Sequence, residues 1–73
     1  MAKLGRYDVE IEYLDEQGNV WDSCAILLTD DLEEATAAAN KVTLKGPYQQ
    51  VSIWMWDENE EYVEDSWVVK EFS

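Results

Sequence analysis

Histidine is missing from this chain, and cysteine, proline and basic residues are scarce: there is one Cys, one Pro and five Lys or Arg in 73 residues. Without histidine, no Ser-His or Cys-His pair can activate a nucleophile. The lone Cys24 cannot form an internal disulfide, and one cysteine without histidine cannot build an ordinary structural zinc site. We therefore expect a protein that is not an enzyme, that binds no cofactor or metal, and that resides in a reducing cytoplasm.

Long hydrophobic runs are lacking as well. The longest, from Cys24 to Leu28, is far shorter than the roughly 20 apolar residues of a membrane-spanning helix. Nevertheless the chain is 47% hydrophobic and holds four Trp, four Tyr and one Phe, which is rich for an acidic disordered chain. This composition predicts a single folded domain over residues 1–73, with no membrane contact.

What the chain has in excess is negative charge. Seventeen Asp and Glu residues against five Lys and Arg give a formal net charge of −12. Self-repulsion at this density opposes compaction, so the charge does not serve stability. It also repels nucleic acids and anionic membranes. We therefore expect no direct binding to nucleic acid, and a partner that is basic.

Two strands are predicted in the first 30 residues. Apolar and acidic residues alternate from Tyr7 to Tyr13, as in a half-buried antiparallel strand, which leaves Asp8, Glu10 and Glu12 together on one face. Residues 15–19 form a turn with Gly18 where a positive φ is needed. A two-residue loop at 17–18 would pair Ile11 with Cys24 and Val9 with Ile26, so that Val20 to Leu28 is the second strand.

A helix is predicted from about Asp31 to Leu44. Asp30 is the expected N-cap, with Glu33 at the spacing of a capping box, and Gly46-Pro47 follows the helix. The apolar stripe that should face the sheet is Leu32, Ala35, Ala38, Ala39 and Val42.

The last third of the chain predicts a second hairpin. A strand from Val51 to Trp56, a three-residue turn at 58–60 and a strand from Tyr62 to Phe72 would pair Met55 with Val63 and Val51 with Trp67. The fold class is then α+β, in the order ββαββ: a four-stranded antiparallel sheet with one helix packed on one face. A right-handed crossover between the hairpins places the first and third strands in the centre.

The carboxylates form three groups that no basic residue interrupts. They are Asp8, Glu10, Glu12, Asp15, Glu16 and Asp22; Asp30, Asp31, Glu33 and Glu34; and Asp57, Glu58, Glu60, Glu61, Glu64 and Asp65. A single such group usually means a solvated surface, whereas three in so small a chain favour a binding role. A calcium loop starting at Asp57 is excluded because Tyr62 and Val68 stand where Gly and Glu are required.

Spacing suggests what the first group could bind. Alternate residues of a strand lie roughly 6.8 Å apart. Asp8, Glu10 and Glu12 would therefore form a row of charges at a pitch comparable with that of nucleic-acid phosphates. Such a row could occupy a groove lined with Lys and Arg.

Trp54 and Trp56 alternate with core positions, so they should lie on the sheet face away from the helix, with Glu10, Glu12 and Glu64. Half-exposed tryptophans on an open sheet either stiffen that face or anchor a protein–protein contact. We expect an interface.

In size, charge and compact α+β pattern, the chain resembles small acidic phage-encoded inhibitors of host nucleic-acid machinery, among them anti-CRISPR proteins, anti-restriction DNA mimics and uracil-DNA glycosylase inhibitors. The stretch from Ala25 to Trp56, in which Asp31-Leu32-Glu33-Glu34-Ala35 opens the helix, also resembles small phage inhibitors of bacterial RNA polymerase. This resemblance implies a phage protein acting in the cytoplasm of a bacterial host. No functional residue is carried over from it.

The leading hypothesis is thus a non-catalytic inhibitor that binds a basic nucleic-acid-binding protein by mimicking phosphates. Its expected contact residues are Asp8, Glu10, Glu12, Asp15, Glu16, Trp54, Trp56, Asp57, Glu58, Glu60, Glu61 and Glu64. The alternatives are a small adaptor or homodimer using the tryptophan face, with charge serving solubility, and an ordinary acidic protein of a salt-adapted organism.

Without histidine, the net charge should be nearly constant from pH 6 to 8, because no other side chain ordinarily titrates in that range.

Overall fold

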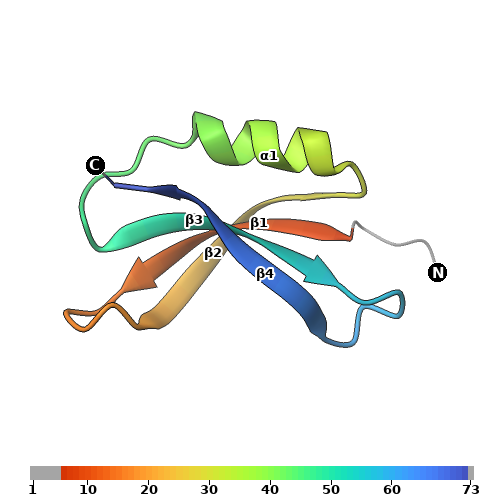
Figure 1. Cartoon of the computed structure of the whole chain (residues 1–73), viewed down its shortest axis with the longest axis horizontal. Helices are drawn as coiled ribbons and strands as arrows, with labels where there is room; N and C mark the ends of the chain where they lie inside the picture. Colours follow the sequence, from red (N-terminus) through yellow and green to blue (C-terminus); the bar gives the residue numbers. More distant parts are fainter. Residues whose placement is uncertain (1–5, 73) are drawn as a thin grey trace.

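The fold is a four-stranded antiparallel sheet that carries one helix on one face, as the computed structural model in Figure 1 shows. The structure describes residues 6–72. Its elements are β1 (Tyr7–Leu14), β2 (Val20–Thr29), α1 (Leu32–Lys41), β3 (Gln49–Trp56) and β4 (Val63–Glu71). The strand order is β2-β1-β3-β4. The expected ββαββ arrangement, with the first and third strands central, is confirmed.

The turn between β1 and β2 is built by Asp15. Its Oδ1 accepts hydrogen bonds of 2.9 Å from the backbone N–H groups of Gln17 and Asn19, and Gly18 adopts a φ of 86°. The backbone N–H of Asp15 also bonds the carbonyl of Asn19, so the loop holds three residues rather than the expected two.

Two bulges adjust the register of this hairpin. Ile11 pairs with Cys24 as predicted, but Val9 pairs with Leu27, because Ile26 bulges out without a partner on β1. Trp21 is skipped in the same way nearer the turn, between the pairs Tyr13–Asp22 and Leu14–Val20. The pairing of Val9 with Ile26 was therefore wrong by one residue, and Ile26 is left exposed.

Helix α1 begins at Leu32, one residue later than expected. Asp31, not Asp30, is the N-cap, and its side chain accepts from the backbone N–H groups of Glu33 (2.9 Å) and Glu34 (3.4 Å). This arrangement satisfies two of the amide groups that open a helix. The Asp30 carboxylate instead accepts from the backbone N–H of Arg6 (2.9 Å).

The helix ends at Lys41, three residues before the expected end, since Val42 is already extended. Lys70 of β4 explains this end: its ammonium group donates to the carbonyls of Asn40 and Val42. A cation at this place satisfies carbonyls that the helix leaves free and complements the helix dipole.

The core lies between α1 and the central strands. Val9, Val51 and Ile53 from the sheet and Ala35 and Ala39 from the helix are all 0% exposed. The alanines let the helix approach closely enough to contact all four strands. Around this core pack Tyr7, Ile11, Leu27, Val42, Leu44, Trp67 and Val69. Ile53 alternates with Trp54 and Trp56 and is therefore expected on the core face, which is confirmed, whereas Leu32 of the predicted helix stripe is exposed.

The register of β3 with β4 differs from the prediction. Met55 pairs with Asp65 and Val51 with Lys70, so that Trp67 lies opposite Ile53. The expected pairs were wrong for two reasons. The turn is one residue longer than expected, since the backbone N–H of Asp57 bonds the carbonyl of Tyr62, and the register shifts twice more along β4, at Glu64 and at Val69.

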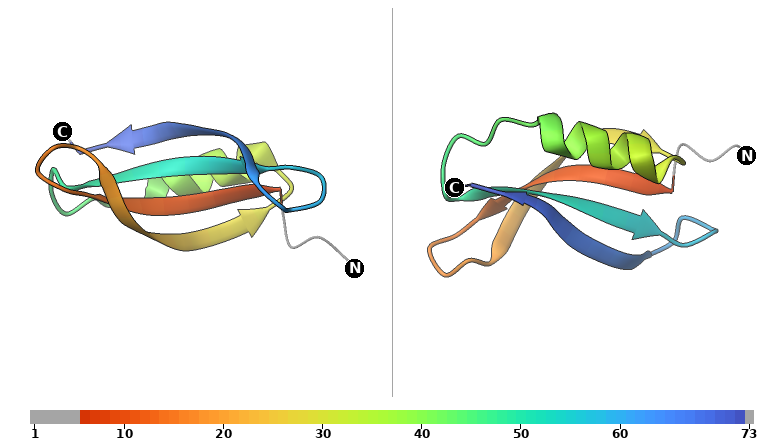
Figure 2. Two further views of the ribbon diagram at one scale, coloured as in Figure 1. Left: turned by 90° about the horizontal axis from the view of Figure 1, so that it is seen from below. Right: turned by 45° about the horizontal axis from the view of Figure 1, so that its top comes forward.

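The sheet is strongly twisted, so the β1–β2 hairpin and the β3–β4 hairpin diverge from each other. Figure 2 shows α1 over one face of the sheet, while the opposite face carries no helix. In Figure 1 the β1–β2 turn and the β3–β4 turn point away from each other, to the lower left and lower right. The two ends of the molecule therefore present different surfaces.

Candidate binding surface

The carboxylate row of β1 is buried. Asp8, Glu10 and Glu12 are 6%, 5% and 8% exposed, and they lie on the sheet face opposite the helix. On β3 they lie opposite Trp54, Ser52 and Gln50. The indole N–H groups of Trp54 and Trp56 donate to the row. The expectation of an exposed row at phosphate spacing is therefore wrong, because large side chains of the neighbouring strand cover it.

Glu12 is the best-satisfied member of the row. Its Oε1 accepts from Gln50 Nε2 (2.8 Å) and from Ser52 Oγ (2.6 Å), and its Oε2 accepts from Trp54 Nε1 (3.0 Å). Three donors from β3 thus converge on one carboxylate of β1. Buried polar groups need such partners, so Glu12 joins the two central strands rather than facing a ligand.

Glu10 and Asp8 form a pair. Burial, the hydrogen bond with Asp8 and the negative charge of Asp8 raise the pKa of Glu10 to about 8, although a hydrogen bond with Ser23 opposes the shift. Asp8 Oδ2 accepts from Trp56 Nε1 at 3.2 Å, and Oδ1 has no donor unless Glu10 is protonated. A buried carboxyl group beside a negative charge is harder to ionise, so Glu10 keeps its proton to a higher pH. The expected constancy of charge from pH 6 to 8 is therefore wrong at Glu10.

The tryptophans of this face are only partly available. Trp54 and Trp56 are half-buried, and their N–H groups point inward at Glu12 and Asp8. Trp54 still lines a shallow cavity of about 280 Å³ with Glu12, Val63 and Ser66. Two aromatics that the residue pattern did not single out as contacts are more open: Trp21 is 67% exposed and Tyr62 is 59% exposed. A partner contact at Trp54 or Trp56 stays a prediction.

A second acidic region lies at one end of the molecule. We call it the acidic end: the residues before and within the first turn of α1, together with the β3–β4 turn and the start of β4. Both parts lie at the right of Figure 1. Its exposed carboxylates are Asp30, Asp31, Glu33, Glu34, Glu58, Glu60, Glu61, Glu64 and Asp65.

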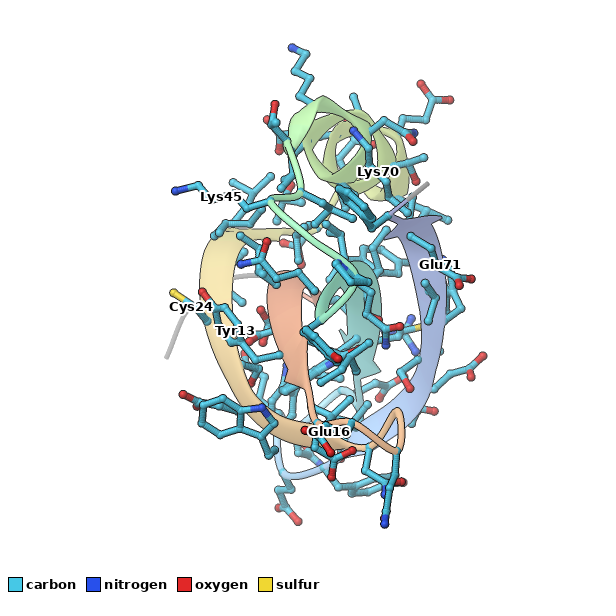
Figure 3. All side chains as sticks on the ribbon, turned by 90° about the vertical axis from the view of Figure 1, so that its left-hand side faces the viewer. Tyr13, Glu16, Cys24, Lys45, Lys70 and Glu71 are labelled. Carbon is cyan, nitrogen blue, oxygen red and sulfur yellow. The ribbon has the colours of Figure 1, made fainter. Side chains whose placement is uncertain are left out.

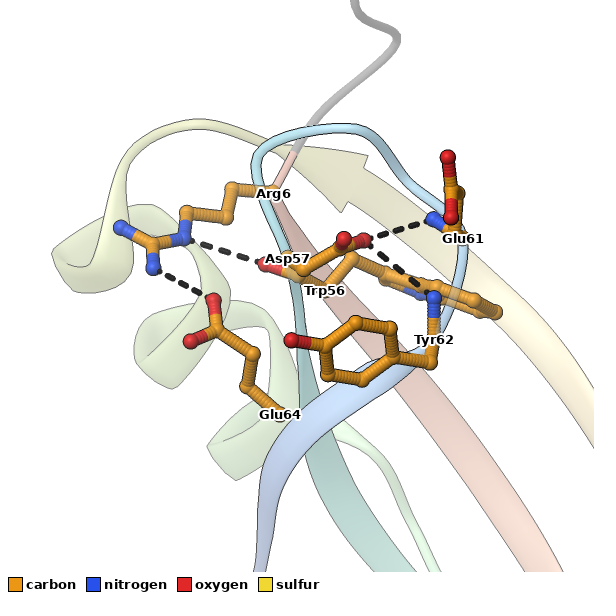
Figure 4. A network of polar contacts seen from close by, with 6 residues as sticks. All are labelled: Arg6, Trp56, Asp57, Glu61, Tyr62 and Glu64. Atoms are coloured by element: carbon orange, nitrogen blue, oxygen red, sulfur yellow. Dashed lines mark hydrogen bonds and ion pairs between the residues drawn. The ribbon is translucent and has the colours of Figure 1, made fainter.

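Arg6 joins the two halves of the acidic end. Its backbone N–H donates to Asp30 Oδ1 (2.9 Å), its Nε to the carbonyl of Trp56 (3.1 Å) and its Nη2 to Glu64 Oε1 (2.9 Å). Figure 4 shows the side-chain contacts of this network. The hydrogen bond to Glu64 raises the pKa of Arg6. Two acidic groups that are separate in the sequence are thus held together in space.

Asp57 organises the β3–β4 turn. It is 7% exposed, and its Oδ1 accepts from the backbone N–H groups of Glu61 (2.6 Å) and Tyr62 (3.2 Å), as drawn in Figure 4. This carboxylate thus faces its own turn, and the expected contact of Asp57 with a partner stays a prediction. Its side chain and those of Arg6, Glu58, Asn59, Tyr62 and Glu64 line a cavity of about 270 Å³.

The remaining predicted contacts lie at the opposite end of the sheet. Asp15 is half-buried in its turn, and Glu16 is exposed at the turn's tip in Figure 3. The same view shows Lys45 and Lys70 near the C-terminal end of α1, away from Glu16. Negative charge is therefore concentrated where the helix begins, and positive charge where the helix ends, in agreement with the helix dipole.

Two further observations concern the part of the chain that the structure describes. It contains no helix with the length and apolar character needed to cross a membrane. Within residues 6–72, no three Asp, Glu, Cys or His side chains are grouped so as to hold a metal ion.

Comparisons with protein-family models, with curated proteins and with solved structures found no match to this chain.

Proposed function

We propose that this protein is a non-catalytic inhibitor whose acidic end occupies the basic, nucleic-acid-binding surface of another protein. The observation that carries the proposal is the convergence of two acidic groups around Arg6, through Asp30 on one side and Glu64 on the other. Carboxylates that the fold holds close together make the local electrostatic potential more negative, and this potential steers a basic partner toward them.

Burial selects which carboxylates can act. Asp8, Glu10, Glu12 and Asp57 are engaged inside the fold. The mimicry therefore belongs to exposed residues such as Glu58, Glu60 and Glu61, not to the β1 row. A groove whose Lys and Arg side chains attract phosphates would attract these carboxylates in the same way.

The resemblance to phage inhibitors and the reducing compartment suggested by an unpaired Cys24 fit a target in the bacterial cytoplasm. In such a complex the nucleic acid and this protein would compete for one surface. Free nucleic acid would not bind this protein, since every phosphate would meet like charge.

The experiment is affinity capture from a bacterial lysate, followed by elution with duplex DNA. We expect basic nucleic-acid-binding proteins to be retained and to be released by the DNA. The test variant replaces Glu58, Glu60 and Glu61 by Gln. The matched control, E16Q/D22N/E71Q, removes the same charge from exposed sites elsewhere.

Loss of capture with the test variant alone supports the proposal. Equal capture by both variants, or retained proteins that DNA does not displace, would contradict it. An adaptor that uses the tryptophan face is the second candidate, favoured by the cavity beside Trp54. It predicts loss of capture in Trp54→Ala with no effect of the charge variants.

A further inference from the structure

The two outer edges of the sheet differ in charge. The outer strand β4 carries Glu64, Asp65, Lys70 and Glu71, whereas ten-residue β2 carries a single charged residue, Asp22. Charged side chains on an edge strand discourage pairing with another chain. In a protein with a net charge of −12, β2 is thus an edge that a second acidic molecule can approach.

The side chains of β2 support this difference. Val20 is 47% exposed, Trp21 67%, and Ile26 and Leu28 are 40% exposed each. Along residues 6–72, β2 pairs only with β1, so its outer backbone groups face away from the sheet. In Figure 3, Cys24 projects outward from this edge. Apolar side chains beside unpaired backbone groups favour strand addition.

We propose that a second copy of this chain pairs with β2 in an antiparallel manner, about a two-fold axis near Cys24, to form one continuous sheet. The inference goes beyond the proposed function and does not depend on it. The bulged residues Trp21 and Ile26 lie on opposite sides of Cys24. A register that opposes the two Cys24 residues therefore also opposes Val20 of one copy and Leu28 of the other.

The side of the sheet on which Val20 and Leu28 lie agrees with this register. Val20 pairs with Leu14, and Leu28 pairs with Asp8, so both lie on the sheet side opposite the helix. Directly opposed side chains of antiparallel strands share a face and interact. The contact between the copies is then apolar on that face.

Electrostatics favours the antiparallel direction. Strand β2 runs toward the acidic end, because Thr29 leads directly to Asp30. Antiparallel pairing puts the two acidic ends at opposite ends of the joined strands, separated by roughly 33 Å of strand. Parallel pairing would place them side by side. The dimer consequently presents two acidic ends that point in opposite directions.

The first experiment measures the mass of the reduced protein by sedimentation equilibrium. We expect a monomer–dimer equilibrium that shifts toward dimer as salt rises to about 0.5 M, where the Debye length is about 4 Å and repulsion between the copies is screened. The test variant is Leu28→Lys. The matched control is Val68→Lys, a residue of similar exposure (44% against 40%) on the same face at the β4 edge.

Loss of the dimer in Leu28→Lys alone supports the proposal, provided that both variants show the cooperative thermal unfolding of the unaltered chain. A monomer at all protein and salt concentrations would overturn it, and so would loss of the dimer in Val68→Lys alone. If Leu28→Lys does not fold, Ala25→Lys on the exposed part of the same strand replaces it.

The second experiment uses Cys24 as a reporter. Diamide oxidises two thiols to one disulfide and is itself reduced. Directly opposed residues have Cα atoms about 4.5–5.5 Å apart, within the range that a disulfide spans. We expect a covalent dimer that forms faster at high salt. Cys24→Ser should prevent the cross-link and keep the dimer seen in sedimentation. Cross-linking no faster than in the monomeric Leu28→Lys variant would contradict the register.

Discussion

The β1 row and the acidic end consist of the same residue types at similar density, yet the fold treats them in opposite ways. Asp8, Glu10 and Glu12 are buried beneath indole rings, whereas Glu58 and Glu60 are exposed. The neighbours decide the difference. A carboxylate that has Ser, Gln and Trp donors beside it on the next strand can be buried at tolerable cost, whereas one at a turn stays in water. A count of charges alone therefore does not locate a binding surface.

The strongest test of this comparison removes one carboxylate from each region. Glu12→Ala leaves Gln50, Ser52 and Trp54 without their acceptor, so we expect the free energy of unfolding to fall by about 2–4 kcal/mol. Glu58→Ala, at an exposed turn, should change it by no more than about 0.5 kcal/mol. Denaturant unfolding at constant pH measures both, and equal losses would show that the row has no special structural role.

A pH titration sharpens the comparison at Glu10. Its pKa is raised from 4.5 to about 8 in the fold. A group with a raised folded-state pKa contributes stability that is complete below pH 4.5 and is lost as the pH rises through 8. Glu10→Gln cannot ionise, so at pH 9 this variant should exceed the unaltered protein in stability by about 2–4 kcal/mol, with little difference at pH 4.

The control for that experiment lies at the acidic end, where Glu60→Gln should not alter the shape of the pH profile. Unfolding midpoints measured at several pH values give the answer. If the unaltered protein and Glu10→Gln follow parallel curves between pH 5 and 9, Glu10 ionises freely in the fold and its pKa is not raised.

Much of the fold follows from patterns in the sequence. Alternation in β1 and β3 and the alanine stripe of α1 predict the core residue Ile53 and the core side of the helix correctly, because each is decided by which face is apolar. The strand order follows from the right-handed crossover between the hairpins. The register near both turns does not follow, since the side chains of Asp15 and Asp57 build turns that loop length alone does not indicate. Polar side chains that fold back onto their own backbone are not visible in a pattern of hydrophobicity.

The candidate site was predicted less well than the fold, for a physical reason. Alternation shows that Asp8, Glu10 and Glu12 share a face, but not that Trp54 and Trp56 cover it. The union of the two acidic groups depends on Arg6, whose contacts reach 24 to 58 residues along the chain. A single basic residue gives no local signal of such a role.

Association kinetics test whether the exposed region carries binding. With the captured partner, the association rate should fall about tenfold or more between 50 and 500 mM salt, because the Debye length shrinks from roughly 14 to about 4 Å. E58Q/E60Q/E61Q should lower the rate at low salt and flatten this dependence. Trp54→Ala should act mainly on dissociation if the ring is an anchor. An association rate that does not depend on salt would contradict the phosphate-mimicry hypothesis and favour the adaptor hypothesis.

The smallest expected effect concerns Arg6, and it separates charge from geometry. The ion pair with Glu64 is exposed to solvent, so Arg6→Gln should change the stability of the fold little. Removing a positive charge makes the acidic end more negative, which should raise the association rate for a basic partner. Loss of the contacts to Glu64 and to the carbonyl of Trp56 should make the carboxylates of the acidic end more mobile and raise the dissociation rate of the complex. Surface plasmon resonance resolves the two rates. A rise in both rates shows that Arg6 positions the carboxylates for binding. A rise in the association rate alone shows that negative charge suffices and that the contacts of Arg6 are not needed for binding.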